Sequence, residues 1–152
     1  MTINIQDDTF GLLTQYQNCD WEFTFSSEYF GHGLTIFIEG SYAEIGDLPE
    51  PEVYKSFKWF CDNQLEIKKI AEKRIFEQYR DSYDVFRQAW GNEADKHVPN
   101  ITLASDIWSL VKNPNISFYC DYCDFGIRWQ TSWDPEHGIN LLFRNGEIIR
   151  VE

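Results

Sequence analysis

The chain has 152 residues and a formal net charge of −12. This length is typical of a single domain, and the charge argues against nucleic-acid binding because phosphate groups would be repelled. No run of about 18 apolar residues is present, so we expect no membrane-spanning segment. The N-terminus lacks the cationic and apolar regions of a secretory signal, so we predict a cytoplasmic protein with reduced cysteines.

The charge is unevenly distributed along the chain. Residues 50–87 hold eight acids and eight bases and are neutral. Two interpretations of the remaining excess stay open: a soluble acidic surface, or a surface that meets a basic partner. The first third of the chain contains no Lys or Arg, and its eight acids are Asp7, Asp8, Asp20, Glu22, Glu28, Glu39, Glu44 and Asp47.

Short strands are predicted for the N-terminal third. We expect them at residues 3–5, 10–16, 21–26 and 34–39, because apolar and polar residues alternate in the last two of these segments, as in a half-buried strand. A glycine-containing loop at 27–33 and a polar connection at 40–49 separate them from their neighbours. The segment is therefore predicted to be an antiparallel meander whose polar face carries only negative charge.

A long helix is predicted from Pro49 to about Trp90. Apolar residues recur there at intervals of three to four, which places them on one face of a helix. Proline is tolerated in the first turn, where its missing N–H would have no partner. We expect this helix to bend or break near Asp81 and Ser82.

After the long helix we predict a second, short helix and four strands. The short helix begins at Thr102 or Ser105, extends to about Lys112 and ends at the turn formed by residues 113–115. Asn145-Gly146 predicts a type I′ hairpin turn between the last two strands. The whole chain, residues 1–152, is thus predicted to be one α+β domain: an antiparallel N-terminal β-meander, one long helix plus a second short helix, and an antiparallel C-terminal β-meander.

Cys120 and Cys123 form one CxxC pair in a segment predicted to be a strand. A structural zinc site needs four ligands, and residues three apart in a strand point to opposite faces. Cys19, Cys61 and the histidines could complete a site, but no second paired spacing occurs. We therefore predict neither metal nor cofactor, and expect buried cysteines that act as small hydrophobic residues.

The turn Trp133–Gly138 gathers two carboxylates and an imidazole. Such groups can perform acid–base chemistry, so a small-ligand site or an enzyme active site is one interpretation. The structural interpretation has Asp134 closing the turn, His137 bonding the backbone, Trp133 packing below and Gly138 supplying a position for positive φ. We favour the structural interpretation and predict no catalytic residue.

The run Trp133-Asp134-Pro135-Glu136-His137-Gly138, followed by an apolar strand and Asn145-Gly146, resembles the C-terminal signature of an uncharacterised bacterial domain family. Members of that family also carry a long charged helix, like Phe60 to Tyr83 here, and a Phe-Gly pair near the N-terminus, like Phe10-Gly11. The resemblance implies a small cytoplasmic bacterial protein, and some members are associated with polymorphic-toxin immunity loci. It implies no catalytic residue.

Together these observations favour an interaction protein: an acidic immunity protein that neutralises a basic toxin domain, such as a nuclease. A small-ligand binder or enzyme at the Trp133–Gly138 turn, and a cytosolic domain without such a partner, remain alternatives. We predict that the partner is held by carboxylates and apolar anchors. The candidate contact residues are the eight acids of the first third together with the aromatic residues Tyr29, Phe30 and Phe37.

Overall fold

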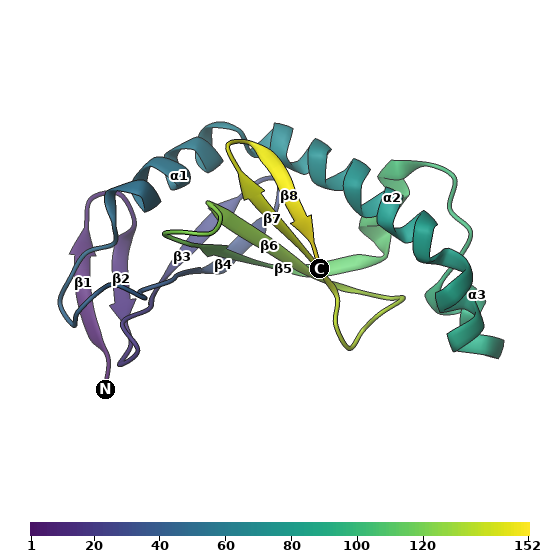
Figure 1. Cartoon of the computed structure of the whole chain (residues 1–152), viewed down its shortest axis with the longest axis horizontal. Helices are drawn as coiled ribbons and strands as arrows, with labels where there is room; N and C mark the ends of the chain where they lie inside the picture. The colour runs from purple at the N-terminus through teal and green to yellow at the C-terminus, as the bar shows by residue number, and fades with distance from the viewer.

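The computed structural model describes all residues from 1 to 152 and contains one eight-stranded sheet with helices on one of its faces (Figure 1). The helical segments are α1 (Pro51–Asp62), α2 (Gln64–Trp90), the 3-10 turn Gly91–Glu93, α3 (Ala94–His97) and the 3-10 helix Ala104–Ser109. The strands are β1 (Ile3–Asp7), β2 (Gly11–Gln15), β3 (Trp21–Ser27), β4 (Gly31–Ile38), β5 (Val111–Phe118), β6 (Phe125–Thr131), β7 (Ile139–Arg144) and β8 (Glu147–Val151).

The strands lie in the sheet in the same order as in the sequence. Strands β1 to β4 and β5 to β8 form two antiparallel meanders, which confirms the predicted α+β class. A parallel pairing of β4 with β5 joins the two meanders into one sheet. A parallel pair requires a long crossover connection, and here α1, α2 and α3 provide it.

The core lies between the helices and the sheet face that they cover. Apolar residues of neighbouring strands form rows across this face; in one row Phe23 is level with Ile36, and Ile36 with Ile116. Phe57 and Phe60 of α1 pack onto Phe118 in edge-to-face contacts with ring centroids 5.6 and 5.8 Å apart, a favourable geometry for aromatic rings. The opposite face carries no helix (Figure 1).

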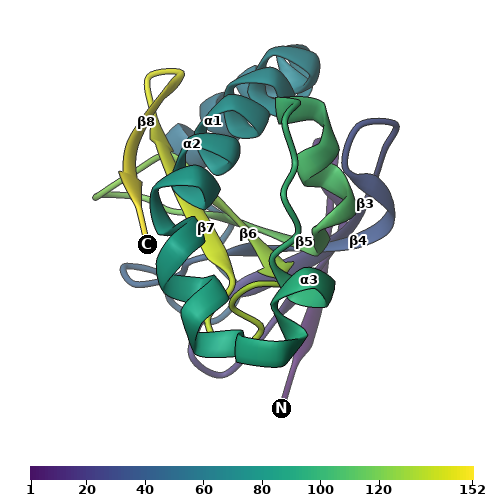
Figure 2. The same ribbon diagram turned by 90° about the vertical axis from the view of Figure 1, so that its right-hand side faces the viewer.

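The long helix is broken at Asn63, and the predicted break near Asp81 and Ser82 is wrong. Asn63 has φ −125° and ψ 22°, outside the helical region. Its side-chain Nδ2 donates to the carbonyl of Trp59 at 2.8 Å, and such local bonds by asparagine compete with the helical pattern. Asp81 and Ser82 lie within continuous helix. After the end of α2 the chain folds back, and α3 lies beside that end (Figure 2).

The second short helix differs from the prediction. It is a 3-10 helix that ends at Ser109, and Val111 and Lys112 already belong to β5. The predicted stop at residues 113–115 is instead a bulge inside this strand, where the register with β6 shifts and Asn113 has φ 55°. A bulge leaves a residue outside the hydrogen-bond ladder and therefore tolerates a proline.

The hairpin prediction at Asn145-Gly146 is confirmed, since both residues have positive φ, 52° and 78°. This is the conformation that a type I′ turn requires. None of the helices is both long enough and apolar enough to span a membrane.

Candidate functional site

The acids of the first third lie mainly at two opposite ends of strands β1 to β4. The β1–β2 and β3–β4 turns carry Asp7, Asp8 and Glu28 at one end. The β2–β3 turn and the connection that follows β4 lie at the other end, which the seven residues of β3 place roughly 20 Å away. That end holds Asp20, Glu39, Glu44 and Asp47, while Glu22 sits between the two groups on the sheet face that carries no helix.

The parallel β4–β5 pairing adds a further segment to the second group. Ile38 is level with Phe118, so the turn at residues 119–124 begins where Glu39 lies. The hydroxyl of Tyr42 donates to Asp121 Oδ2 at 2.9 Å and ties the two segments together. We call this surface the acidic end and define it by Asp20, Glu39, Glu44, Asp47 and Asp121.

Gln15 fixes the connection after β4 to the β2–β3 turn. Its side chain is fully buried; Nε2 donates to the carbonyls of Cys19 and Glu44, and Oε1 accepts from the Gly46 amide at 2.8 Å. Every bonding group of this buried amide is used, as burial requires. The connection that carries Glu44 and Asp47 is therefore anchored.

Exposed apolar side chains accompany the acidic end. Tyr42 is 70% exposed and Tyr122 48% exposed, although no prediction from the sequence singled them out. Ile45 and Leu48 lie on the same anchored connection and are about half exposed. Apolar groups with charged neighbours form the usual centre and rim of a protein interface.

The predicted aromatic contacts have different outcomes. Tyr29 and Phe37 are each 37% exposed, and Phe37 lies beside Glu22 on the sheet face that carries no helix. Phe30 is buried and stacks on Phe60 with centroids 5.7 Å apart, so the expectation of a surface anchor at Phe30 is wrong. Its position as the last residue of the β3–β4 turn concealed its role in the core.

None of the eight acids of the first third takes part in an ion pair. The six ion pairs of the molecule join residues of α1, α2, the α3 region, the β6–β7 turn and the C-terminus. Several of the acids instead bond locally: Asp7 accepts from the amides of Thr9 and Phe10, and Asp20 from the amide of Gly40. Their negative charge is thus left without a cationic partner.

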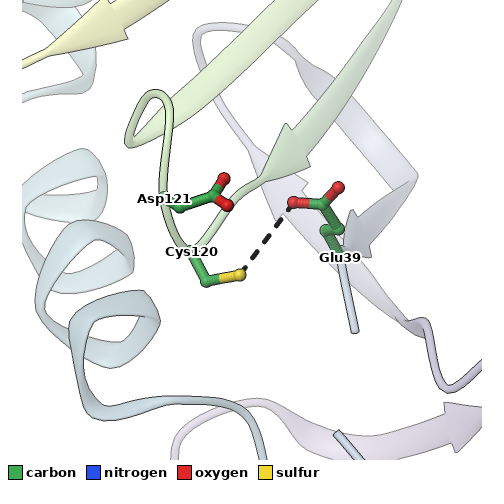
Figure 3. A group of neighbouring side chains, drawn as sticks. All are labelled: Glu39, Cys120 and Asp121. Carbon is green, nitrogen blue, oxygen red and sulfur yellow. Dashed lines mark hydrogen bonds between the residues drawn. The ribbon is translucent and has the colours of Figure 1, made fainter. Parts of the chain in front are cut away.

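The same end brings Glu39, Cys120 and Asp121 together, with ligand atoms within 4.8 Å of one another (Figure 3). The CxxC pair lies in the turn after β5 and not in a strand, so the argument from opposite strand faces does not apply. Burial, followed by the charges of Glu39 and Asp121, raises the pKa of the Cys120 thiol. Both oxygens of Asp121 already accept hydrogen bonds. The cluster is therefore poorly prepared to bind a metal, which needs a thiolate.

The Trp133–Gly138 turn is closed by hydrogen bonds within it, and the His137 ring contacts the Asp134 carboxylate and not the backbone, which was the expected partner. Asp134 Oδ1 lies 3.1 Å from His137 Nδ1 and accepts from its amide at 3.3 Å. Trp133 is buried against Tyr79, with centroids 4.9 Å apart. Gly138 has φ 69°, and a Cβ atom there would lie 2.3 Å from the Trp129 carbonyl oxygen, so only glycine fits.

A hollow of about 260 Å³ adjoins this turn. Arg128 on β6 lines it and donates from Nη2 to the carbonyl of His137 at 2.7 Å. The imidazole of His137 is largely exposed, and its Nδ1 is engaged by Asp134. The turn lies at the end of the sheet opposite to the acidic end, because β6 starts beside residues 119–124 and ends at the turn.

The family model described as a domain of unknown function, DUF6985, matches residues 9–152. No curated protein and no solved structure matches the chain significantly. The family match thus covers every helix and every strand except β1, and its description names no activity.

Proposed function

Because this chain belongs to the family of the domain of unknown function DUF6985, we propose its function from its surface: it is an acidic immunity protein of the bacterial cytoplasm. It binds a basic toxin domain and occludes the active site of that domain. The resemblance of its C-terminal motif to proteins from polymorphic-toxin immunity loci supports the same proposal.

The observation that carries the proposal is the set of unpaired acids in residues 1–49. Eight carboxylates with no Lys or Arg among them and no ion pair elsewhere repel one another in the folded state. A basic partner removes this repulsion on binding and is attracted from a distance, which speeds association.

The acidic end is the best candidate for the centre of the interface. It combines acids with the exposed rings of Tyr42 and Tyr122 on an anchored connection. Tyrosines bury large areas at small entropic cost and commonly contribute most of the binding energy. The acids Asp8 and Glu28 at the other end lie too far away to be part of the same centre.

A nuclease is the toxin class that fits this surface. A nuclease must hold phosphate groups and therefore presents Lys and Arg at its active site. An inhibitor that places carboxylates over those cations competes with the nucleic acid for the same surface. This chain needs no catalytic residue to act in this way.

The test is an association-rate measurement with the inactive form of a cationic toxin domain encoded beside the gene. Glu39→Lys with Glu44→Lys should slow association by about tenfold or more, because both charges enter the electrostatic attraction. Glu66→Lys with Glu77→Lys on α2 is the matched control with the same change in net charge. This control should have a much smaller effect.

Two results would count against the proposal. If the α2 control abolishes binding while the variant at the acidic end binds normally, the interface lies on the helices. If no cationic protein encoded nearby binds at all, the immunity function is wrong. Asp8→Lys with Glu28→Lys should behave like the α2 control when the acidic end is the centre of the interface.

A further inference from the structure

Two adjoining hollows lie between β5, β6 and the β6–β7 turn. The first, of about 260 Å³, is lined by polar side chains that include Asn113, Asn115, Arg128 and Glu136. The second, of about 400 Å³, shares Gln130 with the first and adds Lys112. The two hollows meet at Gln130 and Pro135, and the first exposes mainly polar surface whereas the second exposes mainly apolar surface. Together they form a groove within the range of about 300–1,000 Å³ that small-molecule sites occupy.

The groove carries more cations than acids, whereas the whole molecule carries a large excess of acids. Arg128 lines the first hollow and Lys112 the second, and neither forms an ion pair. Lys112 is level with Gln130, two residues along β6 from Arg128, so both cations stand on the same face of the sheet as diagonal neighbours. Glu136 is the only acid among the lining residues of the two hollows. In a chain with a net charge of −12, a concave surface with two free cations and one acid is suited to an anion.

Three of the lining side chains, those of Arg128, Asn113 and Gln130, are held by hydrogen bonds. Arg128 donates to the His137 carbonyl at 2.7 Å, and Asn113 Nδ2 donates to Gln130 Oε1 at 2.9 Å. Asn113 also lies in the bulge of β5 and has φ 55°. At a bulge the side chains no longer alternate regularly between the two faces of the strand. A site whose side chains are already ordered loses less entropy when it binds a ligand.

We propose that this groove binds a small molecule in which a phosphate is joined to a hydroxyl-bearing sugar, the class that includes sugar phosphates and the ribose phosphate of a nucleotide. The guanidinium of Arg128 and the ammonium of Lys112 contact the phosphate, since a guanidinium matches phosphate oxygens in a two-bond arrangement. The amides of Asn113, Asn115 and Gln130 offer donors and acceptors to the sugar hydroxyls. The site lies at the opposite end of the sheet from the acidic end, so it stands independently of the proposed function.

The experiment is a titration of the full chain with AMP, followed by amide chemical shifts in NMR spectra. We expect shift changes confined to β5, β6 and the β6–β7 turn. Ribose 5-phosphate should bind at the same place, whereas inorganic phosphate and adenosine should each bind more weakly, because each offers only part of the ligand. The binding should weaken as salt is raised.

Three substitutions test the assigned contacts. Lys112→Gln should weaken AMP binding severalfold and Arg128→Gln about tenfold or more, since bonds to charged groups are the stronger ones. Glu136→Gln should tighten binding, because it removes the one repelling carboxylate. Lys58→Gln on α1 is the control and should leave binding unchanged. Circular dichroism confirms that each variant is folded, and Lys112 makes no bond within the turn, so its substitution leaves the turn intact.

Several outcomes would overturn the inference. One is the absence of any shift change in β5, β6 and the β6–β7 turn at millimolar AMP. Another is unchanged binding in both the Lys112→Gln and Arg128→Gln variants. Binding of a single-stranded oligonucleotide without binding of AMP would assign the groove to a different class of ligand and equally contradict the proposal.

Discussion

Trp133 is the residue that joins the C-terminal turn to the helices. Its indole is buried against the ring of Tyr79 on α2, and its carbonyl accepts from Trp90 Nε1 at 2.9 Å. The sequence predicted that this turn is a structural element because its residue types suit a closed turn. It could not predict that two residues of α2 fasten it, since they lie far away in the chain.

Replacing Trp133 by Ala should lower the free energy of unfolding by about 3–5 kcal/mol, the usual cost of truncating a buried aromatic residue. Glu136→Ala, at an exposed position of the same turn, should change it by less than about 0.5 kcal/mol. Chemical denaturation of both variants measures the difference. Equal effects of the two substitutions would show that Trp133 does not pack as described.

The protonation of the Cys120 thiol supports the prediction that the protein binds no metal. Because burial and the neighbouring carboxylates raise its pKa, a metal would have to displace a firmly held proton. We expect the purified protein to contain no stoichiometric zinc by elemental analysis. One zinc per chain that disappears in Cys120→Ser, but persists in the control Cys61→Ser on α1, would contradict this expectation.

Among the elements, the strands with clear alternation could be predicted and their long-range pairing could not. Trp21, Phe23 and Phe25 mark β3 because their spacing reflects one buried face. The pairing of Ile36 with Ile116 cannot be recognised from the neighbouring residues, because β4 could pair in the same way with any other apolar strand. The same limit applies to Asn63, whose side-chain bond to Trp59 breaks a helix that the apolar spacing predicts to continue.

The β1–β2 hairpin is tied to α1 through one carboxylate. Asp7 Oδ1 accepts from the Tyr54 hydroxyl at 2.8 Å, and Oδ2 accepts from the amides of Thr9 and Phe10 at 2.9 Å. Burial by itself raises the pKa of Asp7, but these hydrogen bonds outweigh it and lower the pKa below its ordinary value of 3.8. The stabilisation is therefore present above pH 3.8 and is lost as the pH falls through the lowered pKa.

We accordingly expect Asp7→Ala to lower the midpoint of thermal unfolding clearly at about pH 6 and less at about pH 2, because a growing fraction of the wild-type carboxylate is protonated as the pH falls through its lowered pKa. The neighbouring Asp8→Ala is the control, since Asp8 is exposed and accepts no such bonds, and it should have little effect at either pH. An Asp7→Ala effect of the same size at both pH values would mean that the ionised form contributes nothing.

At the scale of the whole molecule, the fold brings acids that are scattered along the sequence together on one surface, the acidic end. The sequence predicted an acidic first third but not where its charges meet. The parallel pairing of β4 with β5 adds Asp121 and Tyr122 to that surface, and the anchored connection adds Tyr42. These residues escaped prediction because they belong to irregular segments, where the pattern of residue types does not reveal position. The proposed interface is thus built from two segments that the sequence keeps far apart.

An interface of acids around apolar anchors should respond to salt mainly through its rate of formation. Raising the ionic strength from about 0.01 M to about 0.15 M shortens the Debye length from about 30 Å to about 8 Å. Association with a cationic toxin domain should slow markedly over this range, while dissociation changes little, because buried tyrosine rings are not screened. Tyr42→Ala should do the reverse: dissociation speeds up, and the slope of association against salt stays the same. Stopped-flow or surface-plasmon measurements separate the two rates. A salt effect that falls on dissociation alone would mean that ion pairs, and not Tyr42 and its apolar neighbours, hold the complex together.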